Sequence, residues 1–238
     1  MKIAATADIH TRVGDAERLH ALVHDAAHDA DVLAIGGDLT DLGRLEQLEV
    51  LLKVLGTCSM PILVTLGNHD YESGNAAELS RLIEKSNVYL LDRSSVVIDG
   101  VGFSGVKGFC GGFDGNLANS FGEELFKAWV TEGVLEAEAL KHELQRLETE
   151  QRVAVLHYAP IRATVEGEPP EIHAFLGTSH LARALDEGGC HRRLSRACAP
   201  RELQGRDPGW RPGLQRQPTR TRARGFQATL LYSRGLNV

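Results

Sequence analysis

Two hydrophobic periods alternate along the N-terminal part of the chain. Short apolar runs at residues 2–7, 31–35 and 62–66 are typical of buried strands. Between these runs, apolar residues recur at helical spacing over residues 15–30 and 45–55, which predicts two amphipathic helices. The order of strand, helix, strand, helix and strand predicts a parallel sheet with helices packed on it.

Hairpin signals appear further along the chain and predict a second sheet. Asp99-Gly100 is a typical hairpin turn, and it lies between strand-like runs at residues 95–98 and 101–106. Because hairpins replace the strand–helix alternation here, we expect these strands to form a separate sheet that packs on the first.

Four further segments complete the pattern. Helical spacing predicts a helix over residues 76–86 and a long charged helix over residues 123–151, with a break near Gly133. The Gly-rich stretch at residues 107–119 is expected to be a mobile surface loop. Residues 152–156 form one more apolar run and predict another buried strand.

Polar side chains follow several of the predicted strands at the point where each strand ends. They are Asp8 and His10 after the first strand, Asp38 after the second, Asn68, His69 and Asp70 after the third, and His157 after residues 152–156. Each cluster alone is more typical of a solvated turn. Because parallel strands place their carboxyl ends at one edge of a sheet, we expect the clusters to converge there.

The chemistry of these side chains favours a divalent metal. Carboxylate, imidazole and amide oxygen together suit Mn²⁺, iron or Zn²⁺, and the four cysteines lack the CxxC spacing of a thiolate zinc site. A carboxylate shared between two halves of the site, for which Asp38 is the first candidate, would let two metals lie about 3.5–4 Å apart. Two ions at that separation can hold a phosphoryl group during in-line attack.

Composition adds limits on size and location. A chain of 238 residues with 42% apolar residues can form one large domain, and with only 5% aromatic residues its core must be mostly aliphatic. No apolar stretch reaches the ~20 residues of a membrane-spanning helix, and the N-terminus has no secretory signal pattern. The cysteines show no disulfide framework. We therefore expect a cytoplasmic protein with no membrane partner.

Charge is distributed unevenly along the chain. The net charge is −6, yet the segment from residue 190 onward contains eleven Arg, no Lys, and only Glu202 and Asp207 as acids. Helix and strand periodicity also fades there, so we expect a domain at residues 1–189 and an Arg-rich tail at residues 190–238. The alternatives for this tail are a basic nucleic-acid-binding segment, a disordered extension, or the product of a shifted reading frame.

The ordered set of D-x-H, G-D, G-N-H-D and a strand-end His resembles the calcineurin-like metallophosphoesterase family over about residues 1–189. The resemblance implies an α/β fold in which a two-sheet β-sandwich is flanked by helices, giving four αββα layers. It also implies hydrolysis of a phosphomonoester or phosphodiester by attack of a metal-bound hydroxide.

Carried over by position, the resemblance assigns roles to the strand-end residues. The implied metal ligands are Asp8 and His10 for the first metal, Asp38 as the bridge, and Asn68 and His157 for the second metal. The implied catalytic residues are His69, which would face the phosphoryl group, and Asp70, which would orient that imidazole. The implied cofactors are two divalent ions, with Mn²⁺ as first choice and iron or Zn²⁺ as alternatives.

The sequence indicates the substrate only as a broad chemical class. The resemblance implies a phosphorylated small molecule or a phosphodiester as the partner. The acidic body of the chain disfavours a polyanionic nucleic acid as a specific partner. The Gly-rich loop at residues 107–119 is expected to set the choice of substrate.

One part of the family pattern is missing, namely a closing G-H-x-H that supplies one His to each metal. Codons for residues 190–200 can be chosen so that reading one base later gives Val-Thr-Val-Val-Phe-His-Gly-His-Ala-His. Residues 207–218 can likewise be recoded as a turn and a strand. We therefore predict a frameshift near residues 188–190, with the last strands missing or disordered and the activity impaired.

A competing hypothesis is an inactive remnant, or a protein that binds nucleic acid nonspecifically through its basic tail. Metal-dependent hydrolysis of p-nitrophenyl phosphate or its bis-ester would favour the phosphoesterase. Salt-sensitive DNA binding without hydrolysis would favour the competing hypothesis.

Overall fold

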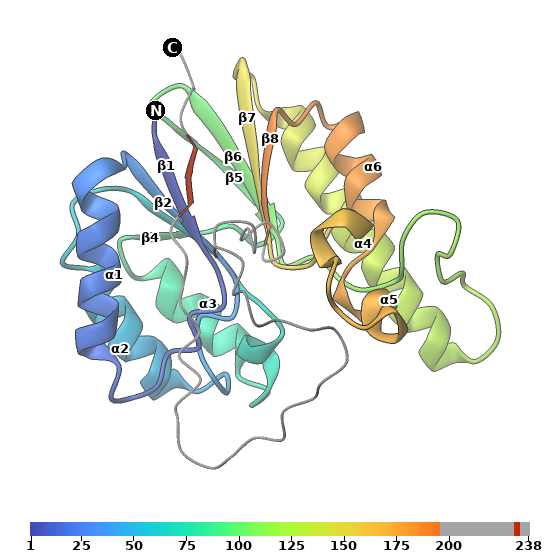
Figure 1. Cartoon of the computed structure of the whole chain (residues 1–238), viewed down its shortest axis with the longest axis horizontal. Coiled ribbons are helices and arrows are strands. Elements are labelled where there is room, and N and C mark those ends of the chain that lie inside the picture. Colours follow the sequence, from blue (N-terminus) through green and yellow to red (C-terminus); the bar gives the residue numbers. More distant parts are fainter. Residues whose placement is uncertain (196–230, 234–238) are drawn as a thin grey trace, which may run out of the picture.

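Two β-sheets lie face to face, and helices cover the outer side of each sheet (Figure 1). The computed structural model describes residues 1–195 and 231–233, and the account below concerns these residues. The strands of the first sheet, in spatial order, are β4 (Val88–Leu90), β3 (Ile62–Thr65), β2 (Val32–Gly36), β1 (Ile3–Thr6) and β9 (Leu231–Ser233). Those of the second sheet are β5 (Ser94–Ile98), β6 (Val101–Val106), β7 (Gln151–Leu156) and β8 (Arg192–Ser195).

The first sheet confirms the predicted strand–helix alternation. β1, β2, β3 and β4 are all parallel, and the helices α1 (Ala16–Asp29), α2 (Leu45–Leu55) and α3 (Ala76–Glu84) connect them. Every residue of β1, β2 and β3 is buried, as expected of parallel strands that are covered on both faces. Their carboxyl ends therefore meet at one edge of the sheet.

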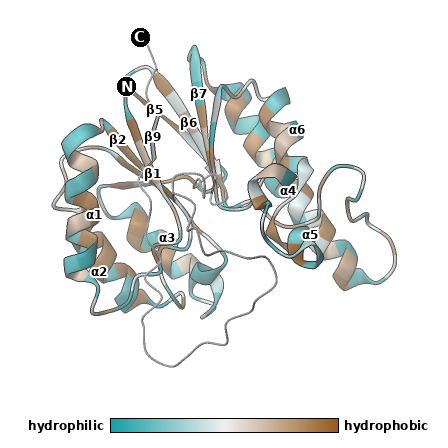
Figure 2. Ribbon diagram, viewed as in Figure 1, coloured by the Kyte–Doolittle hydropathy of each residue, from teal (hydrophilic) through white to brown (hydrophobic). Residues whose placement is uncertain are grey.

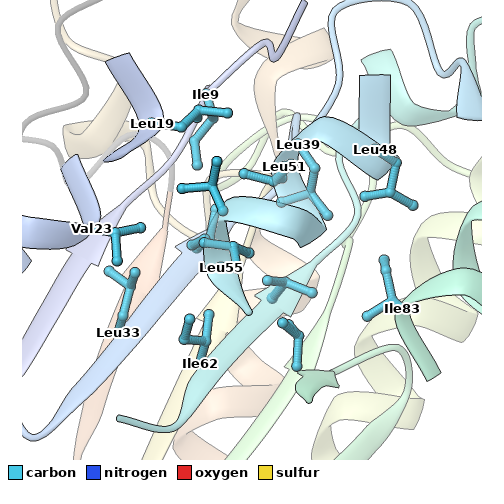
Figure 3. Close-up of a cluster of buried hydrophobic side chains, with 14 of the residues drawn as sticks. Ile9, Leu19, Val23, Leu33, Leu39, Leu48, Leu51, Leu55, Ile62 and Ile83 are labelled. Atoms are coloured by element: carbon cyan, nitrogen blue, oxygen red, sulfur yellow. The ribbon is translucent and has the colours of Figure 1, made fainter. Parts of the chain in front are cut away.

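Alternate residues of these strands enter two different cores. Leu33 and Ile35 of β2 pack against α1 and α2, whereas Val32 and Ala34 face the second sheet. Figure 3 shows the core on the helix side, where side chains from the helices interdigitate with those of the strands. Figure 2 shows hydrophobic colour on the side of α1 that faces the sheet and hydrophilic colour on its outer side.

The second sheet begins with the predicted hairpin. β5 and β6 are antiparallel, with Ile98 opposite Val101 across the Asp99-Gly100 turn. β6, β7 and β8 are parallel to one another. The helices α4 (Glu124–Arg146) and α6 (Ser179–Glu187) cover the outer face through the apolar cluster that includes Leu140, Leu156 and Leu181. The four-layer sandwich predicted by the resemblance is confirmed.

Short helical turns occupy the segments between these elements. They are the 3₁₀ helices η1 (His69–Tyr71), η2 (Arg162–Val165) and η3 (Pro170–Ile172), and the short helix α5 (His173–Leu176). Among the described helices, none is long and apolar enough to cross a membrane.

Two sequence expectations are wrong in the region around α4. The helix continues through Gly133 without a break, and a Cβ at this residue would lie 3.0 Å from the carbonyl oxygen of Cys110. The glycine therefore permits close packing of the helix against the preceding segment. That segment is not wholly a surface loop, because Lys107, Cys110 and Phe113 are buried.

Two strands lie within the tail, where missing or disordered strands were expected. β8 pairs in parallel with β7, and β9 pairs antiparallel with β1 at the edge of the first sheet. The expectation of missing strands is therefore wrong for these two segments. Residues 196–230 and 234–238 lie outside the described part of the chain, and so does the turn and strand predicted from recoding residues 207–218.

Candidate metal centre

The strand ends bring the predicted carboxylates and imidazoles together. Two groups of three side chains have candidate ligand atoms that all lie within 4.8 Å of one another. One group contains His10, Asp38 and His69, and the other contains Asp8, Asp38 and His157. Asp38 belongs to both groups, whereas Asp8 shares a group with His157 and not with His10, although the family resemblance implied that Asp8 and His10 hold one metal and His157 the other.

The carboxylate of Asp38 lies between two imidazoles that come from different sheets. Its Oδ2 is 3.6 Å from Nε2 of His10, and its Oδ1 is 3.4 Å from Nε2 of His157. The Asp38 side chain is fully buried, and its Oδ1 also accepts a hydrogen bond of 2.9 Å from the backbone N–H of His69. One carboxylate therefore contacts groups from three of the four polar clusters.

Three of the predicted ligands have left-handed backbone conformations. Asp8, His10 and Asp38 have φ angles of 55°, 46° and 50°. For residues other than glycine this conformation is uncommon and costs about 1–3 kcal/mol. Hydrogen bonds hold the two turns in place, from Asp8 N–H to the carbonyl of Gly37 and from His10 N–H to the carbonyl of Asp38. Such strain is a frequent property of functional sites.

Two glycines give the centre the space that it needs. A Cβ at Gly37 would lie 2.5 Å from Nδ1 of His157, and Gly37 has a φ angle of +87°. A Cβ at Gly67 would collide with Oδ1 and with the backbone nitrogen of Asp38. The glycines of the G-D and G-N-H-D motifs therefore let backbone approach the shared carboxylate and imidazole.

We predict that Gly67→Ala destabilises the fold and removes metal-dependent activity. The added methyl group would displace Asp38, and overpacking of this kind costs about 1–3 kcal/mol. Thermal denaturation and hydrolysis of p-nitrophenyl phosphate with Mn²⁺ would measure the two effects. The matched control is Gly14→Ala, because no heavy atom lies within 4 Å of a Cβ built there. Equal activity of the two variants would contradict the prediction.

The imidazole of His157 has a defined orientation. It is almost fully buried, and its Nδ1 lies 2.9 Å from the carbonyl oxygen of Gly36. Because a carbonyl can only accept, Nδ1 carries a proton and Nε2 is the other functional atom. Nε2 lies 3.0 Å from Oδ1 of Asn68, as well as near Oδ1 of Asp38. Two oxygens with lone pairs thus face one ring nitrogen, an arrangement that suits a bound cation.

His69 is oriented by the backbone. Its Nδ1 lies 2.8 Å from the carbonyl oxygen of Asp41, so Nδ1 carries a proton here too. Its ring meets the ring of His10 edge to face, with centroids 4.4 Å apart. Nε2 of His69 is consequently the atom available to the centre, as a ligand or as a proton donor.

Asp70 does not orient His69, and that prediction is wrong. The Asp70 carboxylate is fully buried and accepts hydrogen bonds from the backbone N–H groups of Leu39, Thr40 and Gly67, and from the hydroxyl of Thr40. Burial raises its pKa to about 6, against the four hydrogen bonds, which lower it. At neutral pH it is ionised and joins the loops after β2 and β3, so it positions the backbone on either side of the centre.

We predict that Asp70→Ala lowers the free energy of unfolding by about 3–5 kcal/mol, because three backbone N–H groups lose a buried acceptor. Urea denaturation followed by circular dichroism would measure the change. Asp25→Ala is a suitable control, since the Asp25 side chain is 71% exposed on α1. A loss as small as that of the control would show that Asp70 does not hold the loops together.

Two residues near the centre were missed at the level of sequence. The carboxylate of Asp41 lies 4.0 Å from Nδ1 of His10 and forms an ion pair of 2.9 Å with Arg12. Lys107, at the end of β6, accepts backbone hydrogen bonds from His157 and Tyr158 through its carbonyl oxygen. The second Asp of the G-D-L-T-D sequence could have been noticed, whereas nothing in the sequence distinguishes Lys107 from an ordinary loop lysine.

The expected G-H-x-H would fall at residues 196–199, outside the described residues. The strand that precedes these positions is described. β8 is parallel to β7, and Ser195 lies opposite Leu156, the residue before His157. The carboxyl end of β8 therefore lies at the same edge of the sheet as the candidate centre.

Comparisons with known proteins agree with this geometry. A family model described as calcineurin-like phosphoesterase matches residues 1–188. The crystal structure of TT1561 of Thermus thermophilus is similar to the chain with a TM-score of 0.53 and 18% sequence identity, over 82% of this chain and 80% of that one. Another solved structure has a TM-score of 0.54 and 16% identity, over 82% of each chain. No curated protein sequence matches.

The two solved structures support the fold alone, because their sequence identity is low. The family model covers most of the chain and includes the four strand ends that carry the candidate ligands. The family consists of metal-dependent phosphoesterases, and the carboxylates and imidazoles at the sheet edge have the chemistry that such an activity requires. The chain belongs to the calcineurin-like phosphoesterase family.

Proposed function

We propose that this chain hydrolyses a phosphomonoester or phosphodiester at a centre for two divalent metal ions that share Asp38. The observation that carries the proposal is the position of the Asp38 carboxylate, with one oxygen near His10 and the other near His157. A carboxylate can bridge two ions with one oxygen to each, and the two oxygens of Asp38 face different candidate ligand groups.

The donor atoms fit hard to borderline divalent cations. Asp8 and His10 would hold the first ion together with Asp38, and Asn68 and His157 would hold the second ion together with the same carboxylate. Neither candidate group of three described side chains includes a cysteine, which favours Mn²⁺, with iron or Zn²⁺ as alternatives. When bound, such ions polarise phosphoryl oxygens and lower the pKa of water.

The residues of the chain would orient the substrate and move a proton. The carbonyl of Asp41 holds Nδ1 of His69, so the ring presents Nε2 to the centre. A proton held at this Nε2 would pass to the leaving oxygen of the ester, as in general acid catalysis. The carbonyl of Gly36 fixes His157 in the same way and keeps its Nε2 directed at Asp38.

The proposal includes a class of substrate and a compartment. The acidic body favours a small phosphorylated molecule or a phosphodiester over a long nucleic acid. Cys58 and Cys110 are free thiols, which agrees with the reducing conditions of the cytoplasm.

Hydrolysis of p-nitrophenyl phosphate and of bis(p-nitrophenyl) phosphate by the purified full chain tests the proposal. We expect turnover with added Mn²⁺, loss of turnover with a chelator, and recovery when the metal is returned. Titration calorimetry should show two Mn²⁺ ions bound per chain. Turnover that persists in chelator, or salt-sensitive binding to DNA without any hydrolysis, would contradict the proposal and support the competing hypothesis.

A further inference from the structure

Aromatic residues are scarce in this chain, yet many of them gather beside the candidate centre. The sequence contains seven Phe, four Tyr and two Trp. Six of these residues form a connected set, called here the ring track: Tyr71, Tyr158, Phe109, Trp129, Phe126 and Phe175. They come from η1, from the ends of β6 and β7, from α4 and from α5.

The ring track leads outward from a candidate metal ligand. The centroid of the His157 ring is 5.5 Å from that of Tyr158, which is 5.9 Å from that of Phe109. Phe109 is followed by Trp129 at 6.0 Å. Beyond Trp129 lie Phe126, stacked on it at 5.6 Å with an interplanar angle of 22°, and Phe175 at 6.4 Å.

The outer rings of the track are not core residues, whereas Tyr158 packs partly against the buried cluster that contains Leu156 and Leu181. Phe103 and Phe113, which belong to buried clusters, are 0% and 2% exposed. By contrast, Tyr71 is 43% exposed and Phe175 is 60% exposed, and no ring of the track is fully buried. Phe109, Trp129 and Tyr158 are half-buried. Core packing therefore does not account for the exposed rings Tyr71, Phe126 and Phe175, and exposed aromatic side chains that lie close together are a typical sign of a binding site.

A cation lies where the ring track meets the centre. Nζ of Lys107 is 4.6 Å from the ring centroid of Phe109 and 5.4 Å from those of Tyr71 and Tyr158. The buried Glu136 makes its hydrogen bonds to Arg93 and to the N–H of Gly108. The ammonium of Lys107 donates to the carbonyl of Gly108 and is held among aromatic faces. Lys107 is only 7% exposed, and the nearby carboxylates of Glu136 and Glu132 favour its charged form. Its charge is therefore shared between these carboxylates and an anionic group that enters beside the rings.

We propose that the ring track binds a planar aromatic group of the substrate, and that Lys107 attracts an anionic oxygen of the phosphate joined to that group. The inference rests on the proposed function, because the phosphate would lie at the candidate metal centre. Rings accept a planar partner by stacking, and the contact with an aromatic side chain is worth about a tenfold change in affinity or more. An aryl phosphate and a nucleotide share this chemistry.

Binding of phenylphosphonate, which cannot be hydrolysed as an ester, tests the ring track without any need for turnover. Trp210→Phe leaves Trp129 as the single tryptophan of the chain, so its fluorescence reports the ring track directly. With Mg²⁺ present, we expect phenylphosphonate to change this fluorescence and to bind about tenfold more tightly than methylphosphonate. Equal affinities of the two compounds would overturn the inference.

Variants of the inner rings identify where the aromatic group lies. Tyr71→Ala and Phe109→Ala, each added to the Trp210→Phe chain, are expected to weaken phenylphosphonate about tenfold and to leave methylphosphonate unchanged. Tyr89→Ala is the matched control, because Tyr89 is 46% exposed on β4, in the other sheet from β6 and β7. Equal effects of the control and of the two ring variants would overturn the inference.

Kinetic measurements then show whether the aromatic group belongs to an aryl phosphate or to a nucleotide. With Mn²⁺, phenyl phosphate, a nucleoside 5′-monophosphate and glycerol phosphate are compared by phosphate release. We expect Phe109→Ala to raise KM about tenfold for whichever aromatic ester is preferred, and to leave KM for glycerol phosphate unchanged. If none of the esters is hydrolysed but phenylphosphonate binds tightly, the proposed function is contradicted and the inference about the ring track stands. If all three esters are hydrolysed equally well and phenylphosphonate binds no more tightly than methylphosphonate, the inference about the ring track is wrong and the proposed function stands.

Discussion

Asp38→Asn is expected to reduce metal-dependent hydrolysis about 100-fold or more. The amide keeps the size of the side chain and an oxygen that can accept the N–H of His69, so the loop after β3 should keep its conformation. The charge that both ligand groups share is lost, and even residues that only support metal ligands cost 10- to 100-fold when they are changed. Titration with Mn²⁺ should show weaker binding at both sites, because Asp38 belongs to both groups.

The design of this test separates metal binding from folding. Asp25→Asn removes a carboxylate from the exposed face of α1 and should leave both metal binding and activity unchanged. Melting temperatures of the two variants, measured without metal, should be similar. If Asp38→Asn loses only one bound ion while the other is held with unchanged affinity, Asp38 is not a shared ligand and the two-metal arrangement proposed here is wrong.

Restoring the missing motif should increase activity. The triple change Arg196→Gly, Ala197→His and Ala199→His creates a G-H-x-H sequence directly after β8. β8 ends beside β7 at the edge that carries His157, so the new imidazoles would start from the correct end of the sheet. One further ligand for each metal should raise Mn²⁺ affinity and kcat/KM at low metal concentration by about 10- to 100-fold.

A matched control isolates the contribution of the imidazoles. Arg196→Gly with Ala197→Gln and Ala199→Gln introduces side chains of similar size that bind divalent metals poorly, and it should give no increase. The nucleotide sequence provides a separate test of the proposed frameshift. If no one-base shift near residues 188–190 restores G-H-x-H, the frameshift is excluded, whatever the triple variant does.

The first sheet could be predicted from the sequence because its strands are buried on both faces. Such strands are short apolar runs, and the helices between them show clear 3.6-residue periodicity, as α2 over Leu45–Leu55 illustrates. Gly133 shows where this reasoning fails. A glycine lowers helix propensity, but in α4 the contact with the carbonyl of Cys110 decides which residue fits, and that contact is formed only in the folded chain.

The sequence predicted that a second sheet exists, but it did not predict the edge strand β8. β8 contains Arg192 and Arg193, which are not typical of a strand in a parallel pair, so no apolar run marks it. Helix and strand periodicity in the sequence therefore fades after residue 189, whereas the structure continues into β8.

The residues of the candidate centre were predicted better than their roles. Spacing at strand ends indicated which side chains converge, because the parallel topology determines that edge. It could not show that Asp70 binds backbone N–H groups, or that a carbonyl of Asp41 orients His69, because backbone donors and acceptors have the same chemistry at every residue. Lys107 was missed for a similar reason, since its aromatic neighbours come from distant segments.

Asp8, His10 and Asp38 are candidate metal ligands that have a left-handed backbone conformation. Glycine at any of these positions would relax the local conformation and remove a candidate ligand at the same time. A search for thermostable variants that ignored activity would therefore be drawn to the candidate centre itself. Screens that improve this protein should keep the three positions fixed and look for gains in α1, α2 and α3, which contain none of the candidate ligands.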